Sequence, residues 1–410
     1  MDAVSAAPVE HIDNQPDINR LTRAKMATRC AFFIAGFGLA CWAPLVPFAR
    51  ERMGLSDVEL GNLLLFLGIG SVIGMPTAGA LVRHMGSAFV TLLGALGIML
   101  ALPILATTAN HAVLAITLLL FGASIGAVDV GANIHGTEVQ AHAKQPLMSG
   151  FHGFYSIGGL IGSCTITLAL AINFGSVLAA SIGSFIVLMA LLLSVRRFLP
   201  VERKAGSQPL FVMPHGIVVL IGIMALITFL VEGAALDWGA ILLTETRGIT
   251  KDYAGIGYSA FAIAMTAARL VSDGLVVRIG NRAMLAFSSF VTTVGVAIIA
   301  IGPDAWETIC GFLIAGAGAA NLVPVLFTFA ATQKMMPGGH AIAAVSTLGY
   351  LGVFLGPSVV GHMSSLITLP TSFGVLAALM LVVLMFSLVA PLGNKLEGPE
   401  ASHQGTGLTT

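Results

Sequence analysis

Apolar side chains fill long stretches of the chain, and polar or charged residues gather in the short segments between them. Because about 20 apolar residues in a helix span roughly 30 Å of hydrocarbon, each long stretch predicts one membrane-crossing helix. Twelve stretches qualify, at residues 26–48, 59–82, 87–108, 112–137, 147–172, 175–195, 215–243, 253–277, 283–302, 306–332, 340–363 and 369–392. The pattern predicts an all-α membrane protein.

The longest polar interruption, RRFLPVERKAGSQPLFVMP, divides the twelve predicted helices into two sets of six. We interpret it as a cytoplasmic linker between two six-helix bundles. The predicted organisation is a cytoplasmic N-terminal tail at 1–25, a first bundle at 26–195, the linker at 196–214, a second bundle at 215–392 and a cytoplasmic C-terminal tail at 393–410.

The two sets of helices show signs of a duplication. Shifting the sequence against itself by 194 residues places Gly54 on Gly248 and Gly86 on Gly280, and the same shift aligns equivalent loops and helices without a gap. A parallel repeat of six helices is how secondary transporters build two bundles that rock around a central site.

Composition and charge exclude several classes of function. Hydrophobic residues make up 57% of the chain and charged residues 9%, whereas ordinary soluble proteins have roughly 25% charged residues. The formal net charge is zero and no basic patch with interleaved aromatics occurs, so nucleic-acid binding is not expected. No phosphate-binding GxxxxGK[ST] loop or catalytic motif is found, so we expect neither an enzyme, an ATP-driven pump nor a cofactor.

The distribution of positive charge predicts the orientation. Only Arg50, Arg52, Arg247 and Lys251 fall in loops on one side of the predicted membrane, and most other lysines and arginines fall in the tails, the linker and the loops on the opposite side. Cytoplasmic loops carry the excess of positive residues, so both termini are predicted to be cytoplasmic.

The chain resembles the major facilitator superfamily over nearly its whole length. That superfamily has a loop similar to G-x-L-x-D-R-x-G-R-R after helix 2. Here GALVRHMGS keeps Gly79, Leu81 and Gly86 but has Arg83 in place of the acid. The second half offers ARLVSDGLVVRIGNR at the equivalent place. The resemblance implies the twelve-helix major facilitator fold, a small-molecule substrate and a monomer.

Further motifs are similar to one branch and, more narrowly, to one group of sugar importers. The stretches DVGANIHGTEV, MSGFHGFYSIGGLIG and EGAALDW resemble the YbjJ-type proteins of the bacterial inner membrane, which implies that location. The DVGAN segment is also similar to the acid and asparagine in helix 4 of proton-coupled fucose permeases. By that resemblance Asp129 carries the proton and Asn133 contacts the substrate, although Ala43 stands where those permeases have a second aspartate.

Asp129 is the first candidate for proton binding from the residues themselves. Gly122, Gly126, Asp129, Asn133 and Gly136 follow steps of four and three, which places them on one face of a helix. A charged carboxylate in the middle of a membrane helix costs about 2.5–3.5 kcal/mol unless it faces protein or water. We therefore expect Asp129 to face the interior, where it is either a proton carrier or a structural acid bonded to a neighbouring helix.

Several polar or aromatic residues at similar depth are candidates for substrate binding. Counted from the loop between the fourth and fifth helices, His152 lies as deep as Asn133 and Ser156 as deep as Asp129, so these residues are expected to form a polar cluster. His152 can relay protons or simply pack as a neutral residue. Asn321 is expected to contribute from the second bundle, and Trp42 is either a sugar-facing aromatic or a packing residue.

The second bundle supplies further ionisable candidates. Glu232 lies near mid-membrane and is the second candidate for proton or substrate binding, whereas Asp237 lies nearer the outer face, where a gating role is expected. They are five positions and about 140° apart, so both face one spot only if the helix unwinds. Arg269 and Asp273 are one turn apart and predict an ion-paired gate or latch at the cytoplasmic end of their helix.

Together these features predict a secondary transporter that works by alternating access and is coupled to protons, with a small polar, sugar-like solute as substrate and lipid as its solvent. A proton-driven exporter of amphiphilic compounds and a solute receptor that does not transport remain as alternatives.

Overall fold

The computed structural model describes residues 18–143, 147–199 and 213–390, and within these ranges the regular structure is entirely helical. The α-helices are α1 (Ile18–Trp42), α2 (Val46–Met53), α3 (Asp57–Thr107), α4 (His111–Ala143), α5 (Met148–Ala171), α6 (Gly175–Ser194), α7 (Ile217–Thr246), α8 (Ile256–Ile279), α9 (Asn281–Ile301), α10 (Ala305–Ala319), α11 (Leu322–Thr332), α12 (Gly338–Ile367) and α13 (Leu369–Val389). Short 3-10 turns are η1 (Ala43–Leu45), η2 (Val195–Arg197) and η3 (Lys251–Tyr253).

These helices make up twelve membrane-crossing spans, which confirms the number predicted from the sequence. One span combines α1 with α2, α3 contains two spans, and α10 and α11 form one interrupted span. Most of the predicted N-terminal tail, the middle of the linker and all of the predicted C-terminal tail lie outside the described residues.

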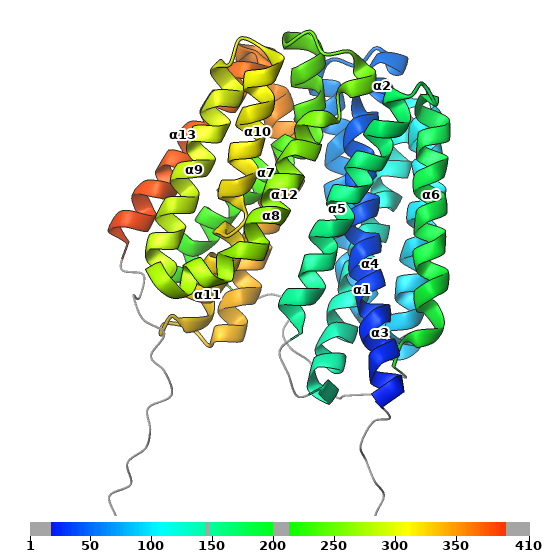
Figure 1. Cartoon of the computed structure of the whole chain (residues 1–410), viewed down its shortest axis with the longest axis vertical. Coiled ribbons are helices and arrows are strands. Elements are labelled where there is room, and N and C mark those ends of the chain that lie inside the picture. The colour runs from blue at the N-terminus through cyan, green and yellow to red at the C-terminus, as the bar shows by residue number, and fades with distance from the viewer. Residues whose placement is uncertain (1–17, 144–146, 200–212, 391–410) are drawn as a thin grey trace, which may run out of the picture.

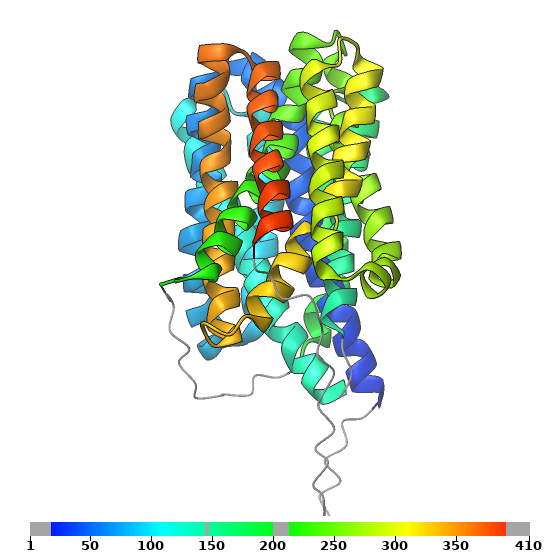
Figure 2. The ribbon, with the colours of Figure 1, turned by 90° about the vertical axis from the view of Figure 1, so that its left-hand side faces the viewer.

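The spans form two bundles side by side, α1–α6 and α7–α13 (Figures 1 and 2). The main contacts between the bundles join α3 to α12 and α5 to α8. Following the predicted orientation, we call the end of the molecule at which α2 lies the outer end and the end at which α1 begins the inner end. The ribbons of the two bundles converge at the outer end and separate toward the inner end (Figure 1).

The same backbone turns recur in both bundles at the spacing of 194 residues. Gly54 and Gly248 both have positive φ, at 64° and 70°. Gly86, which breaks α3 into its two spans, has φ 86° and ψ 160°, and Gly280 between α8 and α9 has φ 82° and ψ 160°. Side chains other than hydrogen rarely tolerate these conformations, so glycine occupies each turn.

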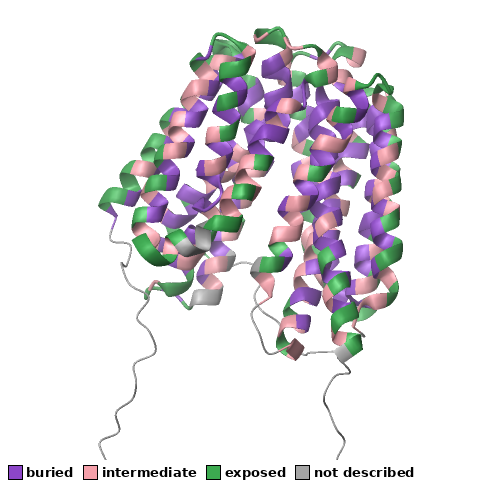
Figure 3. Cartoon of the chain, viewed as in Figure 1, coloured by how far each residue is buried: buried purple, intermediate pink, exposed green. Residues whose placement is uncertain are grey.

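Buried residues fill the inside of each bundle, and exposed residues cover the outward faces (Figure 3). Many of the exposed residues are large and apolar, for example Leu100, Leu168 and Phe287. Because lipid tails are as apolar as leucine, such residues face the membrane without a cost, and the helices are held together by close packing and polar contacts.

Candidate functional site

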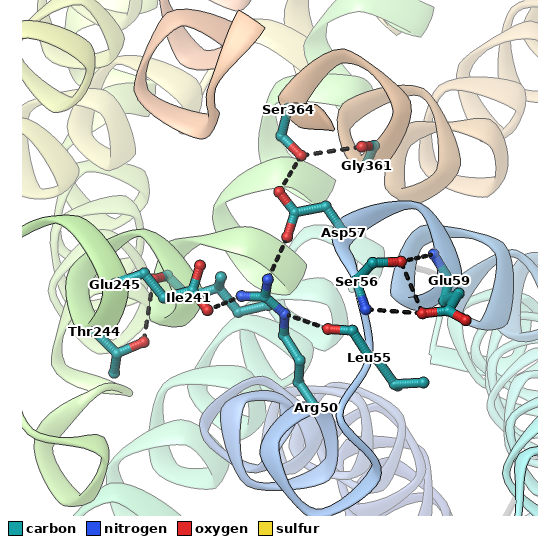
Figure 4. Close-up of polar contacts among 10 residues, drawn as sticks. All are labelled: Arg50, Leu55, Ser56, Asp57, Glu59, Ile241, Thr244, Glu245, Gly361 and Ser364. Atoms are coloured by element: carbon teal, nitrogen blue, oxygen red, sulfur yellow. Dashed lines mark hydrogen bonds and ion pairs between the residues drawn. The ribbon is translucent and has the colours of Figure 1, made fainter. Parts of the chain in front are cut away.

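An arginine at the end of α2 joins the two bundles at the outer end (Figure 4). Arg50 donates through Nε to the Leu55 carbonyl at 3.0 Å and through Nη2 to Asp57 Oδ1 at 2.6 Å, both in the first bundle. Its Nη1 forms an ion pair with Glu245 of α7, and Ser364 of α12 donates to the second oxygen of Asp57. A planar guanidinium with several donors suits this three-way contact.

The local sequence positions this arginine. Gly54, with its positive φ, ends α2, and a capping box in which Ser56 and Glu59 bond to each other's backbone N–H starts α3. The sharp turn between the two helices therefore places Arg50 beside Asp57. Glu51, the next residue, forms an ion pair with Lys251 of the second bundle. We call the contacts of Arg50, Asp57, Glu51 and their partners in the second bundle the outer seam.

Below the outer seam the two bundles touch at close range. A Cβ at Gly61 would lie 2.7 Å from the carbonyl oxygen of Pro357, and Gly68 is packed as tightly against Phe354. Ser358 donates to Asn62 at 3.0 Å across the same interface. Because glycine lets backbones approach this closely, the α3–α12 contact closes the outer half of the molecule.

The α5–α8 contact continues this closure toward the middle. Ser163 and Ser259 share a hydrogen bond of 2.8 Å between their hydroxyls. Deeper, Nη1 of Arg269 in α8 donates to the hydroxyl of Ser156 in α5. The hydrogen bonds and ion pairs that join the bundles among the described residues all lie between the outer end and this level.

Asp129 lies in the middle of α4, and the structure brings it together with Asn133 as predicted. Asn133 Nδ2 donates to the Asp129 backbone carbonyl at 2.9 Å and to Oδ1 at 3.2 Å. The helix face that carries both is packed closely, because the backbone at Gly122 approaches the carbonyl of Leu67 in α3. Both polar side chains are half-buried.

Three tyrosines interact electrostatically with the acids, and the sequence analysis did not single them out. The hydroxyl of Tyr155 in α5 interacts electrostatically with the carboxyl groups of Asp129 and Glu232 and with Tyr258 and Tyr350. We call Asp129, Glu232, Tyr155, Tyr258 and Tyr350 the central cluster. They come from α4, α7, α5, α8 and α12, so both bundles contribute.

Glu232 and Asp237 both belong to α7, which is one unbroken helix, so the unwinding that would turn them to one spot is not seen. Both nevertheless interact electrostatically with Tyr258. The Oε1 atom of Glu232 is buried and has no hydrogen-bond partner among the described residues. A buried carboxyl oxygen without a partner costs free energy, so it is a natural place for a proton or a substrate hydroxyl.

Arg269 reaches inward from α8 to a break in the tenth span. The helix is interrupted between α10 and α11 at Ala320 and Asn321. Pro324 has no N–H and cannot bond to the carbonyl of Ala320, and Arg269 Nε donates to that carbonyl instead, at 3.2 Å. The same guanidinium interacts electrostatically with Glu232, so it links the broken span to the central cluster.

The remaining predicted residues are spread more widely. His152 is exposed, its ring lies 4.8 Å from that of Phe32, and it interacts electrostatically with Arg269. Asn321 is buried at the start of α11. Trp42 has no exposed surface, and its buried Nε1 has no hydrogen-bond partner among the residues that the structure describes.

The three predicted gating residues are Asp237, Arg269 and Asp273. Asp237 is only 6% exposed. The side chain of Asp273 lies outside the described residues, whereas Arg269 makes its described contacts with Ser156 and Ala320. The described polar contacts that join the bundles at the outer end come from Arg50, Asp57 and Glu51 and their partners.

Twelve spans in two repeated bundles around a polar centre define a membrane transport protein, and comparison with known proteins identifies the family. The model of the Major Facilitator Superfamily matches residues 28–332, and the chain belongs to that superfamily. An uncharacterised MFS-type transporter of Yersinia pestis is 41% identical over 370 residues, which are 90% of this chain and 95% of the relative.

Other relatives and solved structures agree. An uncharacterised transporter of Sinorhizobium fredii is 32% identical, over 89% of this chain and 98% of the relative, and the membrane protein MosC of Rhizobium meliloti is 29% identical, over 82% and 83%. The nucleoside transporter NupG superposes with a TM-score of 0.71 at 14% identity, covering 90% of this chain and 98% of NupG. A partially occluded, inward-open structure of the xylose transporter XylE from E. coli gives 0.70 at 13% identity, covering 92% and 100%. These two structures establish the fold.

Proposed function

We propose that this chain is a proton-coupled secondary transporter that moves a small polar, sugar-like solute across the bacterial inner membrane as a monomer, with both termini in the cytoplasm. One observation carries the proposal: Asp129 of the first bundle and Glu232 of the second both interact with the hydroxyl of Tyr155. Because Tyr155 interacts with one acid from each bundle, a change in the charge of either acid would alter the interaction between the bundles.

The chemistry of the central cluster supports proton coupling. A carboxylate in a water-poor interior is costly while it is charged, and binding a proton removes that cost. Tyrosine hydroxyls both donate and accept, so Tyr155 can serve a charged or a protonated acid. The similarity of Asp129 and Asn133 to the helix 4 pattern of fucose permeases supports a proton-binding role for Asp129 and a solute contact for Asn133. By their position and chemistry, Glu232 is the second proton-binding residue of the proposal, and His152, Ser156 and Asn321 are further solute contacts.

The state of the bundles supports alternating access. The outer end is closed by the outer seam and by the α3–α12 contact, whereas His152 on the inner side is exposed. In this conformation a bound substrate would be released toward the inner end. The bundles would then rock to open the outer end. We interpret Arg50, Asp57 and Arg269 as the residues that hold the present state.

Binding is tested first, on purified protein. Thermal unfolding is followed with pentoses, hexoses, polyols, nucleosides, amino acids and cationic amphiphiles, at one acidic and one neutral pH. We expect a polar compound to raise the unfolding temperature of the wild type by an amount that depends on pH. That pH dependence should disappear in Asp129→Asn and persist in Glu307→Gln, a matched variant at an exposed acid outside the central cluster.

Transport is then tested in vesicles with the compound that binds. The wild type should accumulate it against its gradient when a proton gradient is applied, whereas Asp129→Asn should exchange solute without accumulating it. Accumulation by Asp129→Asn equal to that of the wild type would refute proton coupling through this residue. Release driven by proton exchange would instead indicate an exporter, and binding without any flux would indicate a receptor.

The YbjJ-type similarity is the basis for the proposed inner-membrane location. Fractionation of cells that express the full chain, with protease accessibility of a tag on each terminus, tests the location and orientation together.

A further inference from the structure

A cavity of about 700 Å³ lies at the inner end of the first bundle. It is open to solvent and is bordered by the start of α1, by the turn at Gly86 that separates the two spans of α3, and by η2 with the residues that follow it. No residue of the central cluster lines it. The cavity is therefore a separate feature from the proposed transport site.

Four arginines line this cavity: Arg20, Arg23, Arg196 and Arg197. Among the described residues no acidic side chain lines it, and none of the four arginines forms a hydrogen bond or ion pair with another described residue. Like charges gathered around one space repel each other, and an anion between them would relieve the repulsion. The described lining is therefore positively charged, as an anion-binding site is, and holds no acidic side chain that would neutralise it.

A helix start adds to the positive potential. Gly86 has non-helical φ and ψ, so the second span of α3 begins anew at Ser87. Ser87 and Ala88 line the cavity. The first N–H groups of a helix lack partners within the helix and carry a partial positive charge.

The second bundle fills the equivalent space with its own side chain. At the spacing of 194 residues, Gly86 corresponds to Gly280 and Ala88 to Arg282. Arg282 Nε donates to the carbonyl oxygen of Ser387 at 3.1 Å, so a guanidinium bridges the start of α9 and the end of α13. The first bundle has only a methyl group at this position, and the arginines come instead from the surrounding segments.

The segment that carries two of the arginines is held in place by a buried histidine of α4. The backbone N–H of Leu199 donates to His135 Nε2 at 2.9 Å, and the His135 ring lies 4.5 Å from that of Phe198. Nδ1 of the same histidine shares a hydrogen bond of 2.9 Å with Thr28 of α1. Arg196 and Arg197 therefore precede an anchored stretch of chain.

We propose that this cavity binds a phosphate-class anion, presented either by the headgroup of an anionic lipid or by free phosphate. Guanidinium groups bind phosphate oxygens through paired, charge-assisted hydrogen bonds, and several of them around one cavity suit a phosphate with three or four oxygens. The bound anion would tie α1, α3 and the start of the linker together at the inner end of the first bundle.

The test uses the full-length protein purified in a neutral detergent. Thermal unfolding is measured with increasing inorganic phosphate in one arm, and in mixed micelles of phosphatidylglycerol or phosphatidylcholine in the other. We expect stabilisation by at least one anionic probe. Stabilisation by inorganic phosphate alone would indicate that the site binds a soluble anion. Stabilisation by phosphatidylglycerol but not by phosphatidylcholine would indicate that it binds a lipid headgroup.

Matched variants decide whether the cavity is responsible. The double substitution Arg196→Gln/Arg197→Gln removes two cavity charges, and Lys25→Gln/Arg29→Gln removes two charges from α1 outside the cavity. Each lost cavity arginine should weaken binding roughly tenfold, since a hydrogen bond to a charged group is at stake. Equal responses in the two double variants, or no stabilisation of the wild type by either probe, would overturn the proposal.

A third variant tests the cavity without removing an arginine. Ala88→Glu places a carboxylate at the start of the helix that borders the cavity. It should abolish the response to both probes, because the protein then supplies its own anion. A response of Ala88→Glu equal to that of the wild type would also count against the proposal.

Discussion

Replacing Arg50 by Gln and Ser364 by Ala together should shift the protein toward a state that is open at the outer end. Only contacts that break on opening affect this equilibrium. The bonds from Arg50 to Asp57 and to the Leu55 carbonyl stay within the first bundle and cancel. The contacts that count are the ion pair of Arg50 with Glu245 and the hydrogen bond from Ser364 to Asp57.

The magnitude follows from the exposure of these groups. The side chain of Glu245 is 48% exposed, so its ion pair with Arg50 is worth roughly 0.5 kcal/mol. The side chain of Asp57 is 17% exposed, so the hydrogen bond from Ser364 to this carboxylate is worth about 1.5 kcal/mol. Their sum of about 2 kcal/mol corresponds to a roughly 30-fold change in the ratio of the open to the closed state.

The assay is electron–electron resonance between spin labels on the exposed outer-end residues Asn110 of the first bundle and Asp304 of the second, in a variant without the native cysteines. The population at the longer distance should grow in the double variant. Ser365→Ala is the control, because this exposed neighbour of Ser364 bonds to the His362 carbonyl within its own helix. An unchanged distance distribution in the double variant, or an equal shift in the control, would refute the reasoning.

Three further predictions follow from the contacts between and within the bundles. Gly61→Trp should hold the outer end open, because even a Cβ at Gly61 would lie 2.7 Å from a backbone oxygen of α12. Solute binding should persist while transport stops, and a variant that still transports would contradict this prediction. Pro324→Ala should supply the N–H donor that the Ala320 carbonyl lacks within the span, so the break between α10 and α11 can close. We expect a higher unfolding temperature and a lower transport rate, and a lower unfolding temperature would contradict this reasoning. A double-mutant cycle of Ser156→Ala with Arg269→Gln, measured by thermal unfolding, should show a coupling energy of about 1–3 kcal/mol, and additive effects would mean that their hydrogen bond is not stabilising.

The sequence was sufficient to predict the twelve spans and the repeat. Long apolar runs have few alternatives in a membrane, because every backbone polar group must be satisfied within a helix. The glycines aligned by the shift of 194 residues also have matching backbone angles, since only glycine suits those turns. The pairing of Asp129 with Asn133 was predictable too, because it is a contact between successive turns of one helix.

The outer seam could not be predicted from the sequence. Ser364 and Asp57 are 307 positions apart, and no local pattern relates them. The contacts of Arg269 with Ser156 and Ala320 are likewise long-range, so its spacing from Asp273 could not indicate them. Pro324 in the middle of an apolar run was an available signal for the broken span that receives this arginine.

The tyrosines of the central cluster also left a signal that went unused. The chain has four tyrosines, and Tyr155, Tyr258 and Tyr350 lie within helices that cross the membrane. Tyrosines of membrane proteins are usually found at the lipid–water interface, where the hydroxyl reaches water. A tyrosine within the membrane needs a polar partner, and three of them indicate a polar interior.

The two buried tryptophans give the protein an optical reporter of its own. Trp42 and Trp238 have no exposed surface, and within the described part of the chain their indole N–H groups have no hydrogen-bond partner. Trp238 lies against Gly361, close to the outer seam. The third tryptophan, Trp306, is already exposed. Opening of the outer end would admit water near Trp238, so the emission of an unlabelled sample should move to longer wavelength as the bundles rock. The movement of the bundles can therefore be followed in real time in membranes, without any chemical label.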